Sequence, residues 1–170
     1  MAGQLVQVAT STVTSSTGSI KLTGITDDSV YMLAISNAQP TANADALSLR
    51  VLVSGTEDTT SNYDSAVKTL ITNTTFANTA VTNANKWGFN AVGNGTNDQA
   101  NAIIYLYNFY DSNEYSFITV EVNGEYANTG IYRGAQGGGV HTVAQSCNGI
   151  EFLYPAGNIN KATATLYKVV

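Results

Sequence analysis

The sequence is poor in the side chains on which most catalytic and metal sites depend. Its 170 residues include one histidine, His141, and one cysteine, Cys147. A single cysteine excludes an intrachain disulfide framework, and one His with one Cys argues against a zinc site, which needs three or four such ligands. The Gly-x-Ser-x-Gly motif of a nucleophile elbow does not occur. We therefore expect no enzyme, no catalytic residue, and no bound metal or cofactor.

Charged residues and long apolar runs are also scarce. Only 11% of the residues are charged, and 7 basic against 12 acidic side chains give a net charge of −5. The basic residues are scattered singly, so we expect no nucleic-acid binding. No apolar run reaches the roughly 18 residues of a membrane-spanning helix, and Met1–Leu5 lacks the regions of a signal peptide. We expect synthesis in the cytoplasm, without membrane insertion or ordinary secretion.

What the sequence has in abundance is a period-two pattern separated by Thr, Asn and Gly. Leu47–Val53 alternates apolar and polar residues, whereas Val30–Ile35 and Ala102–Phe109 are apolar on both faces. Strands of the second kind are central, and their second face meets a loop, a short helix or another subunit. The other predicted strands cover residues 4–14, 19–24, 115–122, 139–145, 149–154 and 161–169. The pattern predicts one all-β domain over residues 1–170, an antiparallel, jelly-roll-like β-sandwich with at most one or two short helices.

Turn signals and the terminal strand complete the predicted organisation. Asn123-Gly124 and Asn148-Gly149 each predict a hairpin turn, and Pro155–Asn158 predicts a turn before the last strand. Thr72–Gln99 is polar and predicts long loops around one or two short strands. Closure of a sandwich needs pairing of distant strands, so we expect Ala162–Val169 to pair with the other end of the chain.

Two segments allow more than one structure. Tyr63–Ile71 spaces its apolar residues in a way that suits a helix or a strand equally. Gly134–Gly139 is followed by a predicted strand, whereas a phosphate loop needs a strand before it, a helix after it and usually a lysine. It predicts either a mobile loop or a place where backbones approach closely.

Three features could carry chemistry, and each has a simpler interpretation. His141 is interpreted as a strand histidine and Cys147 as a packing thiol, with a catalytic Cys-His pair as the alternative. The segment 57–64 offers carboxylates and amides that suit calcium, or it is a solvated acidic loop. A glycosidase needs two carboxylates flanking a sugar, but the five available glutamates (Glu57, Glu114, Glu121, Glu125 and Glu151) show no specific pattern.

The aromatic residues are the more informative feature, with ten tyrosines and one tryptophan. Tyr and Trp combine apolar area with a polar edge, so they line sugar-binding clefts and protein interfaces. Tyr105, Tyr107, Phe109 and Tyr115 alternate as expected for a core or an inter-subunit face. Trp87 and Tyr132 lie nearer predicted loops and are the two candidate ligand-facing residues.

Several stretches resemble small proteins encoded by marine tailed bacteriophages. The similar stretches are Ile25–Met32, Leu49–Thr56, Ile104–Phe109, Gln136–Thr142 and the closing Gly157–Ile159 with Leu166–Tyr167. They are strand and turn patterns that together span most of the chain. The resemblance implies a virion protein with a β-sandwich fold, of the tail-fibre, head-fibre or capsid-decoration type, and it carries over no catalytic or ligand-binding residue.

These expectations lead to two functional hypotheses. The first is a structural subunit on the surface of a phage particle, which binds other virion proteins and forms a homo-oligomer, with a trimer favoured. The second is a receptor-binding module of a tail fibre, which recognises a host-surface glycan through exposed aromatics and gains affinity by avidity.

Overall fold

The computed structural model describes residues 3–127 and 129–170, and in these residues the chain is built from strands without any helix. The thirteen strands are β1 (Leu5–Val13), β2 (Ser19–Thr23), β3 (Tyr31–Pro40), β4 (Asp45–Val53), β5 (Thr56–Glu57), β6 (Tyr63–Ile71), β7 (Ala77–Ala84), β8 (Trp87–Val92), β9 (Ala100–Tyr107), β10 (Ser116–Tyr126), β11 (Ile131–His141), β12 (Gly149–Leu153) and β13 (Ile159–Val169). The expected all-β class is confirmed, and Tyr63–Ile71 is a strand.

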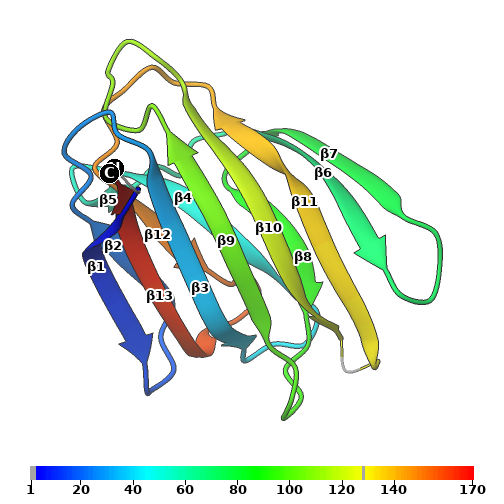
Figure 1. The fold of residues 1–170 in the computed structure, drawn as a ribbon. Coiled ribbons are helices and arrows are strands. Elements are labelled where there is room, and N and C mark those ends of the chain that lie inside the picture. The colour runs from blue at the N-terminus through cyan, green and yellow to red at the C-terminus, as the bar shows by residue number, and fades with distance from the viewer. Residues whose placement is uncertain (1–2, 128) are drawn as a thin grey trace.

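The strands form two antiparallel sheets packed face to face (Figure 1). The larger sheet has the order β1-β13-β3-β9-β10-β11-β6-β7, and the smaller has the order β2-β12-β4-β5, with β8 also paired to β4. Their inner faces share one hydrophobic core, whose largest members include Trp87, Tyr31, Tyr63, Tyr154 and Phe152. The expected antiparallel β-sandwich is therefore confirmed.

The chain ends meet as the sequence predicts. β13 lies between β1 and β3 in the larger sheet, so the last strand pairs with the first one. Two strands, β7 and β8, lie in the polar stretch 72–99, and residues 155–158 form the predicted turn before β13. Among the described residues, no helix is long and apolar enough to span a membrane.

Both Asn-Gly hairpin predictions are wrong. Asn123 and Gly124 lie inside β10, opposite Gly134 and Arg133 of β11, and the turn comes only after Tyr126. Gly124 has a packing role in this position, because a Cβ there would lie 3.0 Å from the carbonyl oxygen of Gln99. The second dipeptide, Asn148-Gly149, lies where the irregular connection from β11 of the larger sheet meets β12 of the smaller sheet. There Asn148 Oδ1 accepts a hydrogen bond from the amide of Gly55.

The glycine-rich segment is also a strand and not a loop. Gly134–Gly139 belongs to β11, which is longer at its start than predicted and ends at His141. A Cβ at Gly137 would lie 2.2 Å from the carbonyl oxygen of Ala66 on β6, so the alternative prediction of close backbone approach is confirmed. These glycines let β11 lie close to both of its neighbours, β10 and β6, on the right of the larger sheet in Figure 1.

Candidate functional site: the outer face of the larger sheet

Three of the candidate residues, Trp87, His141 and Cys147, are completely buried. Trp87 Nε1 donates hydrogen bonds to the carbonyl oxygens of Asp64 (3.1 Å) and Val140 (3.3 Å). Its ring meets that of Tyr63 edge to face, with centroids 4.9 Å apart. The prediction that Trp87 lies at the surface is therefore wrong, because β8 starts with this residue and directs it into the core, where Gly139 leaves space for the indole.

His141 ends β11 beside this aromatic pair, with its ring centroid 4.7 Å from that of Tyr63. Its Nε2 lies 3.2 Å from Asp58 Oδ2, although within the described part of the chain neither ring nitrogen has hydrogen-bond geometry to a partner. Burial lowers the pKa of His141 below its usual value, and this effect outweighs the opposing influence of Asp58. The ring is therefore neutral at pH 7, and its position in β11 confirms the strand-histidine interpretation.

Cys147 is packed where it cannot reach a substrate. Its Sγ lies 3.9 Å from Ser116 Oγ and 3.6 Å from the carbonyl oxygen of Gln145. Burial raises the pKa of the thiol to about 11, so it is protonated at neutral pH. This environment favours the packing role over a catalytic thiolate.

The carboxylates of the acidic loop have separate partners. Glu57 forms an ion pair with Lys21, Asp58 accepts hydrogen bonds from Thr60 and Gln145, and Asp64 accepts one from the amide of Asn83. In the ranges 3–127 and 129–170, no three His, Cys, Asp or Glu side chains gather into a metal-binding group. The loop is thus organised by its protein contacts.

The larger sheet presents a different kind of surface on the side away from the core. On β9 and β10 every second residue is buried, and the residues between them point outward. The exposed positions include Ile103, Tyr105 and Phe117, which are 46%, 38% and 42% accessible. These fractions are large for apolar side chains on adjacent strands, so the outer face carries exposed apolar side chains among polar ones such as Thr119 and Asn123.

The strand register extends this surface across the whole sheet. One outward-facing residue from each strand forms a continuous uncharged row, which we call the apolar row. In sheet order it consists of Gln7, Tyr167, Met32, Tyr105, Thr119, Gly138, Ala66 and Ala80. Bulky side chains occupy one half of the row and small ones the other, so the face has a raised part and a lowered part.

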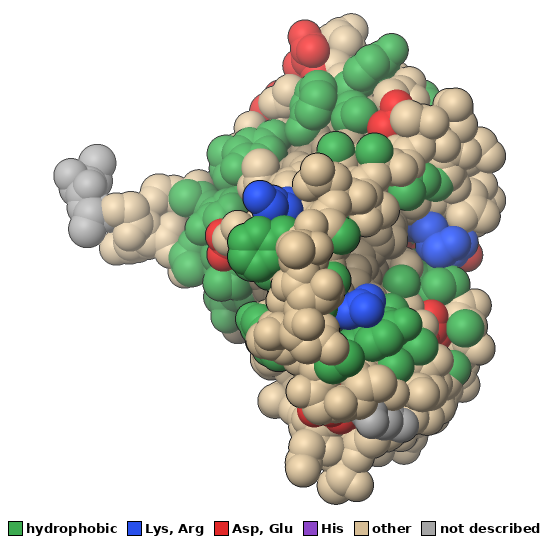
Figure 2. All heavy atoms as spheres, turned by 90° about the vertical axis from the view of Figure 1, so that its right-hand side faces the viewer, with side chains coloured by type: hydrophobic (Ala, Val, Ile, Leu, Met, Phe, Trp, Pro, Cys, Tyr) green, Lys and Arg blue, Asp and Glu red, His purple; other side chains and the backbone are tan. Residues whose placement is uncertain are grey.

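The lowered part forms an apolar hollow of about 510 Å³. Its floor includes Gly138, Ala66 and Ala80, and Phe117 and Val140 contribute to its lining from β10 and β11. Figure 2 views the molecule from the β7 side, and hydrophobic side chains gather at the left of that view, along the outer face of the larger sheet. A hollow with this lining is suited to an apolar side chain of another protein.

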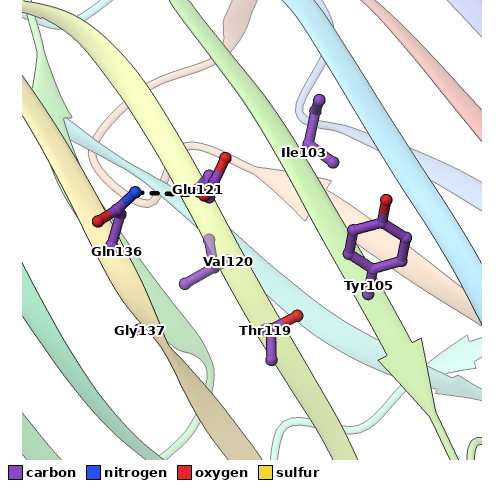
Figure 3. Close-up of a pocket in the computed structure, with 7 residues that line it drawn as sticks. All are labelled: Ile103, Tyr105, Thr119, Val120, Glu121, Gln136 and Gly137. Carbon is purple, nitrogen blue, oxygen red and sulfur yellow. Dashed lines mark hydrogen bonds between the residues drawn. The ribbon is translucent and has the colours of Figure 1, made fainter.

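A second, smaller hollow of about 310 Å³ lies over β9, β10 and β11. Figure 3 shows the Tyr105 ring and Ile103 on one side of it and the Glu121–Gln136 pair on the other. Gln136 Nε2 donates a hydrogen bond of 3.2 Å to Glu121 Oε1, and Thr119 adds a hydroxyl. An aromatic ring beside a carboxylate and an amide is an arrangement that can bind a sugar.

The sequence indicated part of this surface. The aromatics predicted together as a core or an inter-subunit face are divided between the two in the structure, since Tyr105 and Tyr115 are exposed and Phe109 is buried. Tyr132 is 49% exposed on β11, in line with its predicted surface position. Phe117 and the small residues of the hollow were missed, because their importance depends on the register between β10, β11 and β6, which no local pattern specifies.

Comparisons of the chain with protein-family models, with curated proteins and with solved structures give no match.

Proposed function

We propose that this protein is a structural subunit of a bacteriophage particle, which works by protein–protein assembly through the outer face of its larger sheet and catalyses no reaction. The observation that carries the assembly role is the apolar row with its hollow. The row carries no charge, although Gln7 and Thr119 in it are polar, and its hollow is lined mainly by apolar groups. Exposed apolar surface of this kind is expensive to leave in water, and a partner that covers it gains the corresponding free energy. The virion setting comes from the resemblance to small phage proteins.

The buried positions of His141 and Cys147 support a role without catalysis. Both side chains are inaccessible, and a nucleophile or base must reach a bound substrate within hydrogen-bond distance. The most reactive groups of the chain thus stabilise the core, and the exposed face offers contact area in place of chemistry.

The first experiment locates the protein and tests the face together. Antibodies to the purified protein should label intact particles of the source virus in electron micrographs, and free protein should block the labelling. Phe117→Asp places a charge beside the hollow and should weaken incorporation into particles at least tenfold. Asn123→Asp is the matched control, because it adds the same charge on the same side of β10, away from the hollow.

The outcomes separate the parts of this proposal. Label on the particle with loss of incorporation for Phe117→Asp alone supports assembly through the outer face. Equal incorporation of both variants would contradict the use of this face, and the absence of label on any particle would contradict the virion role.

A second candidate function, glycan binding by a tail-fibre module, is favoured by the smaller hollow. The Tyr105 ring can stack on a sugar, while Glu121 and Gln136 can accept and donate hydrogen bonds to its hydroxyls. Tyr105→Ala should abolish binding to an array of bacterial surface glycans, whereas Tyr132→Ala tests the aromatic residue predicted from sequence. Binding that survives Tyr105→Ala would exclude this hollow as the glycan site.

A further inference from the structure

The strand at one edge of the larger sheet lacks the features that normally protect an edge. β7 has the sequence Ala-Asn-Thr-Ala-Val-Thr-Asn-Ala, with no charged residue, proline or glycine, and its residues from Ala77 to Asn83 are all exposed. Edge strands present unpaired N–H and C=O groups, and soluble monomers usually block them with lysines, prolines, bulges or covering segments. Among the described residues, β7 pairs with β6 on one side and has no strand on the other.

The backbone of β7 is suited to form another ladder. It pairs with β6 in uninterrupted register from Ala77 opposite Thr69 to Val81 opposite Ser65. The irregularity comes after Val81, where the register shifts and Asn83 adopts a φ of 54°. Within the regular part, alternate residues direct their N–H and C=O groups away from β6, toward the open side.

Apolar side chains accompany this edge at both ends of its regular part. Phe76 immediately precedes β7 and is 60% exposed, with Lys68 Nζ above its ring at 5.2 Å from the centroid. Val81 is 41% exposed, and its neighbour Ala80, on the outward side of β7, lines the apolar hollow. The edge is therefore continuous with the outer face, and a partner strand on β7 would also cover part of that apolar surface.

The opposite edge of the same sheet is built differently. β1 is uncharged too, but its register shifts in its first half, between Gln7 and Ala9, and bulges of this kind discourage edge pairing. Its second half alternates exposed residues with half-buried or buried ones and ends at the buried Val13, whereas β7 is exposed almost throughout. One protected edge and one open edge favour a closed contact over an open-ended chain of molecules.

We infer that β7 pairs antiparallel with β7 of a second copy of this chain, so that two larger sheets join into one across a two-fold axis. This inference rests on the proposed assembly role and names one partner in it, namely the protein itself. A two-fold contact is self-complementary, since each residue of β7 faces a residue of the same strand. Because β7 carries no charge, no like charges face each other on the paired strands.

Charged substitutions in the regular part of β7 test this pairing. Thr79→Lys and Ala80→Lys alter neighbouring positions on opposite faces of the strand and should each raise the dimer dissociation constant at least tenfold in sedimentation experiments. Thr12→Lys is the matched control, because Thr12 is an exposed threonine on the other edge strand, β1. Thermal unfolding of each variant checks that the fold is kept.

Cysteine cross-linking tests the two-fold symmetry independently of any loss of stability. Single cysteines at Thr79, Ala80 and Val81 should include one that forms a disulfide with its own copy under mild oxidation, since positions near the axis face themselves. Mixed samples with cysteine at Thr79 and at Thr10 of β1 should give no cross-link between the two variants. Cys147 is buried and stays reduced.

The possible results separate this inference from the proposed function. Dimers that persist with both lysine variants, or cross-links between β7 and β1, would overturn the β7 pairing. A protein that is monomeric at every concentration would also overturn it, and labelled virus particles would then still support the structural role. Only a monomer that is in addition missing from the particles would reject both.

Discussion

The two faces of the larger sheet are built from the same strands but differ in how completely their side chains are packed and hydrogen-bonded. On the inner face, Tyr63 and His141 pack together, and Trp87 of β8 in the smaller sheet packs against Tyr63. The polar atoms of the Trp87 and Tyr63 rings have hydrogen-bond partners. On the outer face, Ile103 and Phe117 are exposed to solvent, and Phe117 lies beside the small residues that leave a hollow. The inner face stabilises the fold, and the outer face is the surface through which we propose that the protein assembles.

This difference extends to the two edges of the sheet. β1 has a bulge and is partly buried, whereas β7 is exposed over most of its length. A chain with a shared core and an open edge strand in its larger sheet still presents unpaired backbone groups to a partner. The contrasts between faces and between edges can each be tested by substitutions at matched positions.

The largest effect is expected from one charge placed on either side of β10. Ile118→Asp buries a carboxylate in the core and should lower the free energy of unfolding by about 4 kcal/mol or more. Phe117→Asp replaces the adjacent, outward-facing residue and should change the free energy of unfolding by less than about 1 kcal/mol. The same substitution should disrupt assembly. Chemical denaturation of the two variants measures both values.

The orientation of β10 decides this comparison, because a shift of one residue would exchange the two faces. If Phe117→Asp destabilised the monomer as strongly as Ile118→Asp, the outer face would belong to a core and could not be an interface.

A smaller effect is expected from a single methyl group on β11. In Gly139→Ala the new Cβ would lie 2.5 Å from Trp87 Nε1 and 2.8 Å from the carbonyl oxygen of Asp64. Backbone and a rigid ring have little freedom to move, so the variant should lose about 2 kcal/mol of stability. Gly18→Ala is the control with no heavy atom within 4 Å, and it should change stability by less than about 0.5 kcal/mol.

Thermal unfolding of both glycine variants gives the comparison directly. Equal stability of Gly139→Ala and Gly18→Ala would contradict the packing of the Trp87 indole against Gly139.

Period-two patterns were sufficient to predict most of the fold. The alternation in Leu47–Val53 and the long apolar stretch Ala102–Phe109 depend on neighbours within one strand, so local reasoning places them correctly. Asn123-Gly124 misled because its turn preference is weaker than the pairing of β10 with two neighbouring strands. Trp87 misled for a related reason, since a polar neighbourhood in sequence says nothing about which sheet closes over the residue.

The candidate site was less predictable than the fold. The apolar row takes one residue from each of eight strands, and those strands lie in an order unrelated to their order in the chain. The row can be assembled only after the register of every pair is known. The two-sided apolar character of Ala102–Phe109 nevertheless indicated that a second surface needed cover, and its outward residues Ile103 and Tyr105 lie in the exposed face.

The smallest expected effect concerns pH and again compares the two faces. Burial lowers the pKa of His141 in the folded protein, whereas in the unfolded chain it lies near 6.5. Between these two values the unfolded state binds more protons, so stability falls as pH decreases through the unfolded value and stops falling below the folded one. Denaturation of the wild type from pH 8 to pH 5 should show this loss.

His141→Gln should remove that dependence, because glutamine keeps a polar side chain at the end of β11 but does not titrate in this range. The loss should be seen at low protein concentration, where the chain is monomeric, since the histidine lies on the inner face and has no part in the outer surface. Asp58 and Asp27 have lowered pKa values, so their contributions are lost only at more acidic pH, below about 4. An unchanged slope between pH 8 and pH 5 in the variant would show that His141 is not the source of the acid sensitivity, and a slope that appears only in the oligomer would place a titrating group at the interface.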